Sequence, residues 1–168
     1  MLDLIDRISN ACGRLAAWLF FAIGVMITYE VVARYLFNAP TIWAEEMSRF
    51  FQLWAVYIAA AYVLRHRQLI RITLLIDRLG PTGRRLAEAF TLIWIIAFCV
   101  VVIWKGSVIV IDSVAIGRAT STMLGVPKWM TESAVPIGFT LLLLQTLAEL
   151  VRLARGAPVD TGRIEEQM

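Results

Sequence analysis

Stretches without charged residues divide the chain into four segments. Each holds 15 or 16 residues and is flanked by charged side chains. About 20 helical residues cross the hydrocarbon of a bilayer, and flanking Arg and Lys side chains can reach the headgroups. The pattern therefore predicts four transmembrane helices. The charge-free stretches are Leu15–Tyr29, Phe50–Leu64, Ala89–Trp104 and Ser133–Ala148, and the expected spans are about 15–34, 44–64, 87–106 and 130–150.

Composition supports a membrane protein. Hydrophobic residues make up 60% of the 168 residues and charged residues 17%, whereas soluble domains have roughly 45–50% and roughly 25%. A soluble chain of this size has too much surface to cover with so few charges. The net charge of +3 does not indicate a nucleic-acid partner. We expect an all-α membrane protein with one domain over residues 1–156 and a short cytoplasmic tail at 157–168.

The uneven distribution of Lys and Arg predicts the orientation in the membrane. The amino end, the second connection and the tail carry eleven of these residues, and the first and third connections carry five. Because segments rich in Lys and Arg stay on the cytoplasmic side, both termini are expected in the cytoplasm. A cleavable signal peptide would also explain the first stretch. Asp3 and Asp6 stand where such a peptide has basic residues, however, so we expect a retained helix.

The connections have predicted structure of their own. The segment Asn38-Ala39-Pro40-Thr41 combines a capping side chain with a proline, and two acids follow, so the second helix is expected to begin there. Regularly spaced apolar residues in the cytoplasmic connection predict a short interfacial helix that ends at Gly80-Pro81. The third helix is expected to run past the bilayer and break near Gly117. The spaced apolar residues are Leu69, Ile72, Ile76 and Leu79.

The sequence contains no pattern that predicts catalysis. His66 is its single histidine and lies in the basic connection, whereas haem ligands would stand inside the helices. Cys12 and Cys99 are expected to be unpaired thiols, and no credible metal site results. The sequence also has no phosphate-binding loop and no nucleophile elbow. We expect a protein that is not an enzyme and carries no cofactor.

Two ion pairs are predicted near the first connection. Glu30 precedes Arg34 by four residues and Glu45 precedes Arg49 by four, which is the favourable spacing on a helix. Glu46 lies three residues before Arg49 and would join the second cluster. A functional interpretation stays open for both, because a charge within a membrane helix often serves transport and a charge at a helix end can enter a groove of a partner protein.

Other polar and aromatic residues fit a membrane bundle. Gln145 is expected to donate or accept a hydrogen bond across helices. Tryptophans near the ends of the spans predict an aromatic belt at the membrane interfaces. These tryptophans include Trp43, Trp54, Trp104 and Trp129.

Two segments resemble the small membrane subunit of TRAP transporters, the tripartite ATP-independent periplasmic family (DctQ-like proteins). Residues 34–49, RYLFNAPTIWAEEMSR, are similar to the family's Arg, short turn, Trp and Glu-Glu pair at the start of the second helix. Residues 121–129, STMLGVPKW, followed by Pro136-Ile137-Gly138-Phe139, resemble the family's second turn and its Pro-x-Gly entry to the fourth helix. Thr73 departs from the pattern, because an acid often stands there.

The resemblance implies a non-catalytic subunit in sodium-coupled uptake of organic anions, typically carboxylates, across a bacterial inner (cytoplasmic) membrane. The subunit would pack in the lipid bilayer against a larger membrane subunit that carries the sodium and substrate sites. A soluble periplasmic substrate-binding protein would deliver the substrate. The residues expected at the partner interface are Arg34, Trp43, Glu45, Glu46 and Arg49, and those expected on an outward docking surface are Ser121, Pro127, Lys128 and Trp129.

Two other functions stay open as alternatives. A self-sufficient small transporter or proton-coupled carrier would use Glu30 inside the first helix. Such a carrier usually has an internal repeat and interrupted helices, which the sequence does not display. A membrane-bound enzyme subunit would carry a bound cofactor.

Overall fold

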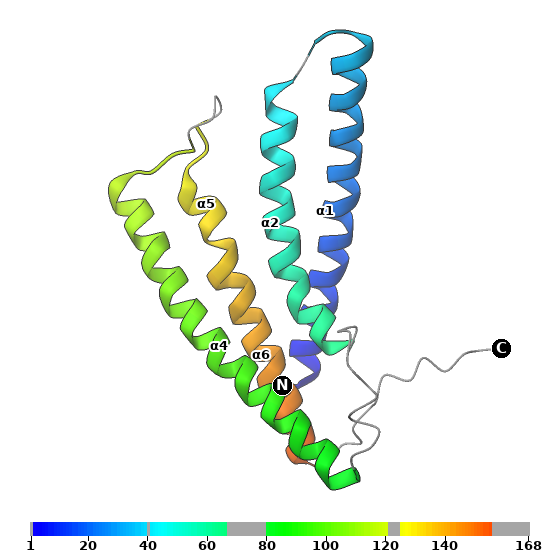
Figure 1. Ribbon diagram of the computed structural model, residues 1–168, viewed down its shortest axis with the longest axis vertical. Helices are drawn as coiled ribbons and strands as arrows, with labels where there is room; N and C mark the ends of the chain where they lie inside the picture. The colour runs from blue at the N-terminus through cyan, green and yellow to red at the C-terminus, as the bar shows by residue number, and fades with distance from the viewer. Residues whose placement is uncertain (1, 40, 67–79, 121–124, 156–168) are drawn as a thin grey trace, which may run out of the picture.

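Within the residues that the structure describes, the chain forms four long helices and one short helix (Figure 1). The computed structural model describes residues 2–39, 41–66, 80–120 and 125–155. The expected interfacial helix near 69–79, Ser121 and the tail at 157–168 lie outside these residues. The helices are α1 (Leu2–Leu36), α2 (Ile42–Arg65), α4 (Pro81–Ile116), the short α5 (Lys128–Glu132) and α6 (Ala134–Ala154).

Each long helix is long and apolar enough to cross a membrane, the fourth together with the short α5 before it. The first three expected spans lie within α1, α2 and α4, and the fourth, 130–150, begins in α5 and continues in α6. The prediction of four membrane-spanning helices is therefore confirmed. The helices extend beyond the charge-free stretches, most clearly in α1 and α4, because charged residues at their ends are also helical. The spanning segments are Leu4–Leu36, Trp43–Arg65, Thr82–Ile116 and Lys128–Ala154.

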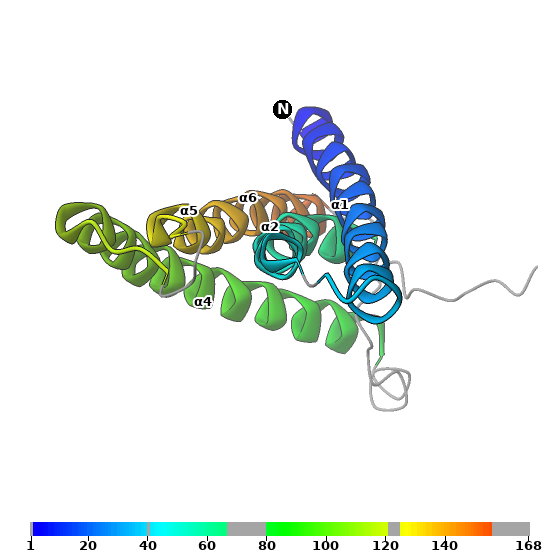
Figure 2. The ribbon, with the colours of Figure 1, turned by 90° about the horizontal axis from the view of Figure 1, so that it is seen from above.

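The helices form two antiparallel hairpins. In one hairpin α1 packs against α2, and in the other α4 packs against α6. Seen from above, α2 and α6 lie side by side in the centre and α1 and α4 flank them (Figure 2). The hairpins diverge toward the α1–α2 turn and the α4–α5 turn (Figure 1). The beginning of α1 and the ends of α2 and α6 meet at the other end of the bundle.

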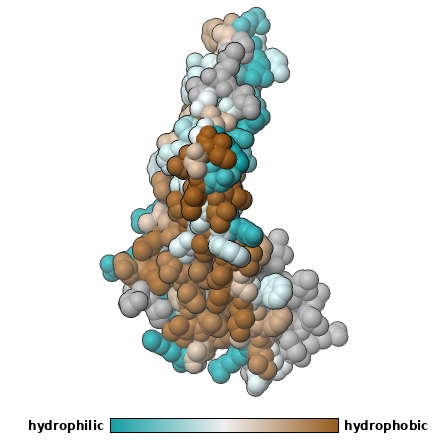
Figure 3. Space-filling model, turned by 90° about the vertical axis from the view of Figure 1, so that its left-hand side faces the viewer, coloured by the Kyte–Doolittle hydropathy of each residue, from teal (hydrophilic) through white to brown (hydrophobic). Residues whose placement is uncertain are grey.

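Small side chains fill the contacts between helices. Seven of the twelve buried hydrophobic residues are alanines, whereas Trp18, Phe90 and Trp94 are each 70% exposed. Small residues between helices and large apolar residues outside are typical of membrane bundles, where close backbone approach stabilises the packing. On the side of the molecule that carries α4, apolar residues cover most of the middle (Figure 3).

Two glycines mark the closest approaches to α2. A Cβ atom built on Gly138 of α6 would lie 2.5 Å from the Cβ of Tyr57 and 2.7 Å from its carbonyl oxygen. A Cβ atom on Gly13 of α1 would lie 2.3 Å from the ring of Tyr62. Only glycine fits these two places without a shift of the neighbouring helix or ring.

Two predicted helix ends can be compared with the structure. The third long helix ends at Ile116, and Gly117 caps it with a left-handed φ of 67°, which confirms the expected break. The second helix begins at Ile42, as expected. The expected capping by its own side chains is wrong, because Thr41 makes no side-chain cap hydrogen bond and its hydroxyl donates to Glu30 of α1 instead.

Candidate functional site

Glu30 connects α1 to the start of α2. Its carboxylate accepts hydrogen bonds from Arg34 Nη2 at 2.8 Å, from the backbone nitrogen of Thr41 at 3.0 Å and from the Thr41 hydroxyl. Glu30 is buried, whereas the Arg34 side chain is half exposed. The predicted pair of Glu30 with Arg34 is therefore confirmed. The carboxylate also lies at the amino end of α2, where the helix dipole favours a negative charge.

A groove of about 410 Å³ lies beside this junction, between the end of α1 and the beginning of α2. Charged side chains of both signs line its polar part, and Ile27 and Val31 contribute apolar wall. Among the residues expected at a partner interface, the structure brings three into this groove and leaves Trp43 and Glu46 outside its lining. The three residues are Arg34, Glu45 and Arg49.

The neighbouring acids Glu45 and Glu46 lie in opposite environments. Glu45 pairs with Arg49, and both side chains are more than half exposed. The expected pairing of Glu46 with Arg49 is wrong: both carboxylate oxygens of Glu46 are shielded from solvent, and within the described part of the chain they have no hydrogen-bond partner. Successive residues of a helix point about 100° apart, so Arg49 meets only one of the two acids. A shielded carboxylate without a donor is unfavourable.

Two tryptophans hold α2 to its neighbours. The ring of Trp43 lies 6.0 Å from that of Tyr29 on α1, measured between centroids, and Trp43 is 45% exposed. The indole nitrogen of Trp54 donates to the carbonyl oxygen of Met130 at 3.2 Å, which connects α2 to α5. The start of α2 thus contacts α1, and the middle of α2 contacts α5 of the other hairpin.

The turn between α4 and α5 is held by its backbone. The Thr120 nitrogen donates to the Val126 carbonyl at 2.9 Å, and the Lys128 nitrogen donates to the Arg118 carbonyl at 3.0 Å. The hydroxyl of Ser113, which is fully buried, donates to the Glu132 carboxylate and connects α4 to α5. The turn is thus fixed to both helices.

Three of the four residues expected on the docking surface belong to this turn or to the helix after it. Pro127 is exposed, Lys128 is half-buried, and Trp129 is 40% exposed. Pro127 is the residue immediately before α5, and Lys128 and Trp129 are its first two residues. They therefore lie next to one another at one end of the second hairpin.

An ion cluster that sequence reasoning missed joins three helices at the opposite end of the bundle. The Asp6 carboxylate of α1 pairs with Arg65 of α2 at 3.3 Å and with Arg152 of α6. Arg65 also donates to the Asp6 carbonyl at 2.7 Å, and Arg152 donates to Glu149 at 2.6 Å. The two acids and two arginines balance in charge and are 13–27% exposed. The sequence gives a signal for Arg65 and Glu149, which directly follow apolar stretches, but not for Asp6, which lies nine residues before Leu15.

Comparison with known proteins identifies the family. The profile of the family described as "Tripartite ATP-independent periplasmic transporters, DctQ component" matches residues 23–156. The chain belongs to this family. The matched residues contain both segments on which the resemblance was based, so the assignment as a TRAP transporter small permease subunit is confirmed.

Three relatives carry related names. The isethionate TRAP transporter permease protein DctMQ of Oleidesulfovibrio alaskensis is 28% identical over 152 residues, which are 85% of this small permease subunit and 24% of that protein. A Haemophilus influenzae protein proposed as a TRAP transporter small permease is 25% identical over 103 residues, 61% of this chain and 64% of that one. The sialic acid TRAP transporter small permease protein SiaQ of Vibrio cholerae is 24% identical over 157 residues, 89% of this chain and 87% of that one. The small permease subunit thus spans about a quarter of the first relative and most of the third.

Proposed function

We propose that this small permease subunit is a non-catalytic scaffold for a larger transport subunit. The complex would take up organic anions, carboxylates above all, with sodium, and a periplasmic binding protein would deliver them. The observation that carries the proposal is the contrast between large apolar faces outside the chain and the ion pairs inside it, which join Glu30 to Arg34 and Asp6 to Arg65 and Arg152. A chain of this kind offers surfaces to a neighbour and little polar space for a substrate pathway of its own.

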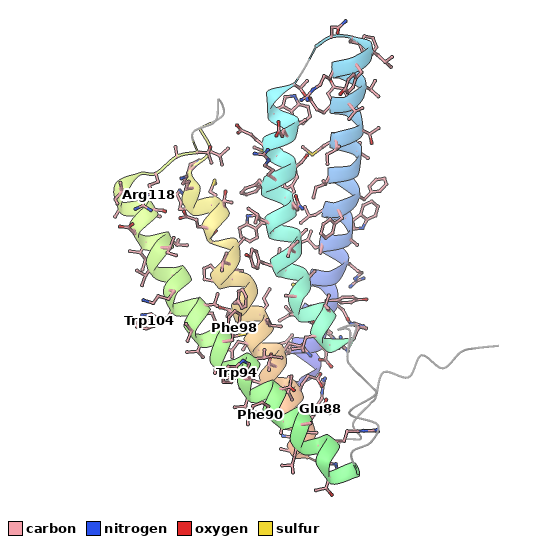
Figure 4. The ribbon with its side chains drawn as sticks, in the orientation of Figure 1. Glu88, Phe90, Trp94, Phe98, Trp104 and Arg118 are labelled. Carbon is pink, nitrogen blue, oxygen red and sulfur yellow. The ribbon has the colours of Figure 1, made fainter. Side chains whose placement is uncertain are left out.

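The outer helices provide the apolar faces. In the most apolar part of α4, 11% of the residues are buried within the chain, against 28% in α2. Phe90, Trp94 and Trp104 follow one another along α4, and Trp104 points away from the other helices (Figure 4). These three side chains are 65–70% exposed. Apolar faces as large as that of α4 have to be covered by lipid or by a membrane partner. A scaffold subunit in a membrane complex contacts both.

The length of one relative supports a larger partner. In the isethionate permease protein, the segment similar to this chain occupies 24% of the protein. A segment similar to this chain that is joined covalently to the rest of a longer permease protein is consistent with a non-covalent contact between separate chains here. The substrates in the relatives' names, isethionate and sialic acid, are both organic anions, which supports the proposed substrate class.

We place the partner contact at the beginning of α2. The groove beside Glu30 presents Arg34, Glu45 and Arg49, with Trp43 and Glu46 on the adjoining surface of α2. Glu46 has the strongest need of a neighbour, because its shielded oxygens lack a donor in the described chain. A basic or amide side chain from the large subunit would satisfy it.

We place the binding-protein contact at the turn before α5. Pro127, Lys128 and Trp129 combine a proline, a cation and an exposed aromatic ring, and Ser121 belongs to the same connection in sequence. A contact between this turn and a periplasmic protein requires the turn to face the periplasm, and therefore both termini to be cytoplasmic in a bacterial inner membrane. The charge distribution supports that orientation, because the amino end, the second connection and the tail carry most of the Lys and Arg residues in the sequence.

A carrier that uses Glu30 has less support. A transporting carboxylate has to release its partner to take up a proton or an ion, whereas Glu30 is held by Arg34 and by two groups of Thr41. The residue instead fixes the turn between the first two helices.

Reconstitution tests the scaffold proposal. Liposomes that contain this chain alone are expected to take up no organic anion, with or without an inward sodium gradient. Co-expression with a large TRAP membrane subunit is expected to give a complex that does so when the binding protein is added. Uptake by the isolated chain would refute the scaffold role.

Two adjacent substitutions test the partner surface. Glu46→Gln is expected to lower the yield of the complex, because it removes the charge that the partner would neutralise. Glu45→Gln is the matched comparison, since it makes the same change in an exposed carboxylate of the same surface that Arg49 already pairs, and the yield is expected to fall less. Equal yields from both variants, or a change in substrate selectivity with Glu46→Gln, would contradict the assignment.

A further inference from the structure

A small cavity lies inside the bundle near the Asp6 ion cluster. Its volume is about 20 Å³, and α1, α2 and α6 all contribute to its wall. Apart from the Cys12 thiol, the two polar side chains in the wall are Ser9 of α1 and Gln145 of α6. A volume of roughly 10–15 Å³ holds one water molecule, so the cavity has room for one and for nothing larger.

Ser9 differs from the other hydroxyl residues of the long helices. It is 3% exposed, and its Oγ has no hydrogen-bond partner among the residues described. Ser48, by contrast, donates to the carbonyl of Ala44 at 2.6 Å, four residues earlier in its helix. Thr28, Thr91, Thr140 and Thr146 make the same bond four residues back. The Ser9 hydroxyl thus remains available to the cavity that it lines.

Gln145 presents the second unpartnered atom. The residue is 0% exposed, and its Nε2 donates to Asp6 Oδ1 at 3.5 Å and to Glu149 Oε1 at 3.3 Å. Its Oε1 is buried and has no partner in the described structure. Exchanging the two ends of the amide would bring its oxygen against two carboxylates, so the orientation is fixed. Gln145 lines the cavity, whereas Asp6 and Glu149, which accept from its nitrogen, do not.

We propose that this cavity binds one water molecule, which bridges Ser9 Oγ and Gln145 Oε1. The water donates one hydrogen bond to the Gln145 oxygen. It forms a second hydrogen bond with the Ser9 hydroxyl, in which either group can be the donor. An uncharged ligand fits, because the nearest acids are already paired with Arg65 and Arg152. The water extends the ion cluster inward and joins α1 to α6, two helices that meet only over a short stretch.

A structure of the full chain at a resolution that shows ordered waters tests the proposal directly. We expect a density peak within about 2.6–3.2 Å of both Ser9 Oγ and Gln145 Oε1. In Ser9→Ala we expect this peak to be lost. In detergent micelles, the same substitution is expected to lower the midpoint of thermal unfolding by about 2–4 °C, because a buried carbonyl then lacks its bridge.

Ser48→Ala is the matched control. It removes an equally buried hydroxyl that is satisfied by its own helix, so the unfolding midpoint is expected to change by less than about 1 °C. A map in which the Ser9 hydroxyl bonds to the carbonyl of Ile5 and the cavity holds no density would overturn the proposal. Equal shifts in the midpoints of the two variants would also overturn it. Neither outcome bears on the scaffold role, which rests on other residues.

Discussion

Replacing Gly138 with alanine should separate the two central helices. The new Cβ would lie 2.5 Å from Tyr57 Cβ, whereas non-bonded carbon atoms stay roughly 3.5–4.0 Å apart. The gap therefore has to open by about 1 Å. The atoms that it meets are the Cβ, carbonyl carbon and carbonyl oxygen of Tyr57, and no side-chain rotation moves them away. The shift has to come from α2 or α6 as a whole.

The expected loss of stability follows from two opposing effects. Overpacking of this kind costs about 1–3 kcal/mol, and alanine regains about 1 kcal/mol of helix propensity relative to glycine. We expect a net loss of up to about 2 kcal/mol, which is a fall of about 4–8 °C in the midpoint of thermal unfolding for a chain of this size. Tryptophan fluorescence of the purified chain in detergent during a temperature ramp measures this midpoint.

Gly24→Ala is the control for this prediction. Gly24 also lies within a long helix, but a Cβ there would meet nothing within 4 Å. The same chemical change is therefore expected to leave the midpoint unchanged or to raise it slightly. If Gly138→Ala and Gly24→Ala unfolded at the same temperature, the conclusion that α2 packs closely against α6 at Gly138 would be wrong.

Four further predictions concern the helix contacts and ion pairs, each measured as a shift in the unfolding midpoint. Gly13→Ala should destabilise the chain less than Gly138→Ala, because the ring that it meets can rotate; a larger effect would contradict this. Asp6→Asn should cost about 2 kcal/mol or more, since it leaves two largely buried arginines short of one charge, and a neutral result would argue against the cluster. Glu30→Gln should lower the midpoint because it weakens the charged hydrogen bonds of this carboxylate, and an unchanged midpoint would show that these bonds contribute little. A double-mutant cycle on Glu45 and Arg49 should give less than about 0.5 kcal/mol, because the pair is exposed; a larger coupling energy would indicate a shielded pair.

Contacts between residues close in sequence could be predicted, and contacts between distant residues could not. Helical spacing predicts the bond from Arg34 to Glu30, because four residues bring the two side chains to one face. The same rule does not reach Thr41, which is 11 residues from Glu30. Asp6 pairs across 146 residues with Arg152, and this pairing depends on how the helices pack.

The extent of the helices was also only partly predictable. Hydropathy predicts the middle of each helix, because lipid-facing residues have to be apolar. The ends of α1 contain Asp6 and Arg34, which interrupt the apolar pattern and nevertheless remain helical because each finds an opposite charge. The prediction that Glu46 joins the ion pair of Glu45 and Arg49 is wrong, because one guanidinium cannot face both acids.

The unequal lengths of the helices have a consequence for the lipid. With a rise of about 1.5 Å per residue, the 36 residues of α4 span about 54 Å and the 24 residues of α2 about 36 Å, whereas bilayer hydrocarbon is about 30 Å thick. The longer helix α4 therefore has to tilt or to extend into the headgroups, whereas the length of α2 nearly matches the thickness of the hydrocarbon core. Lipids with acyl chains of different length would change the tilt of α4. Membrane thickness would thereby adjust the angle at which the bundle meets any neighbouring protein.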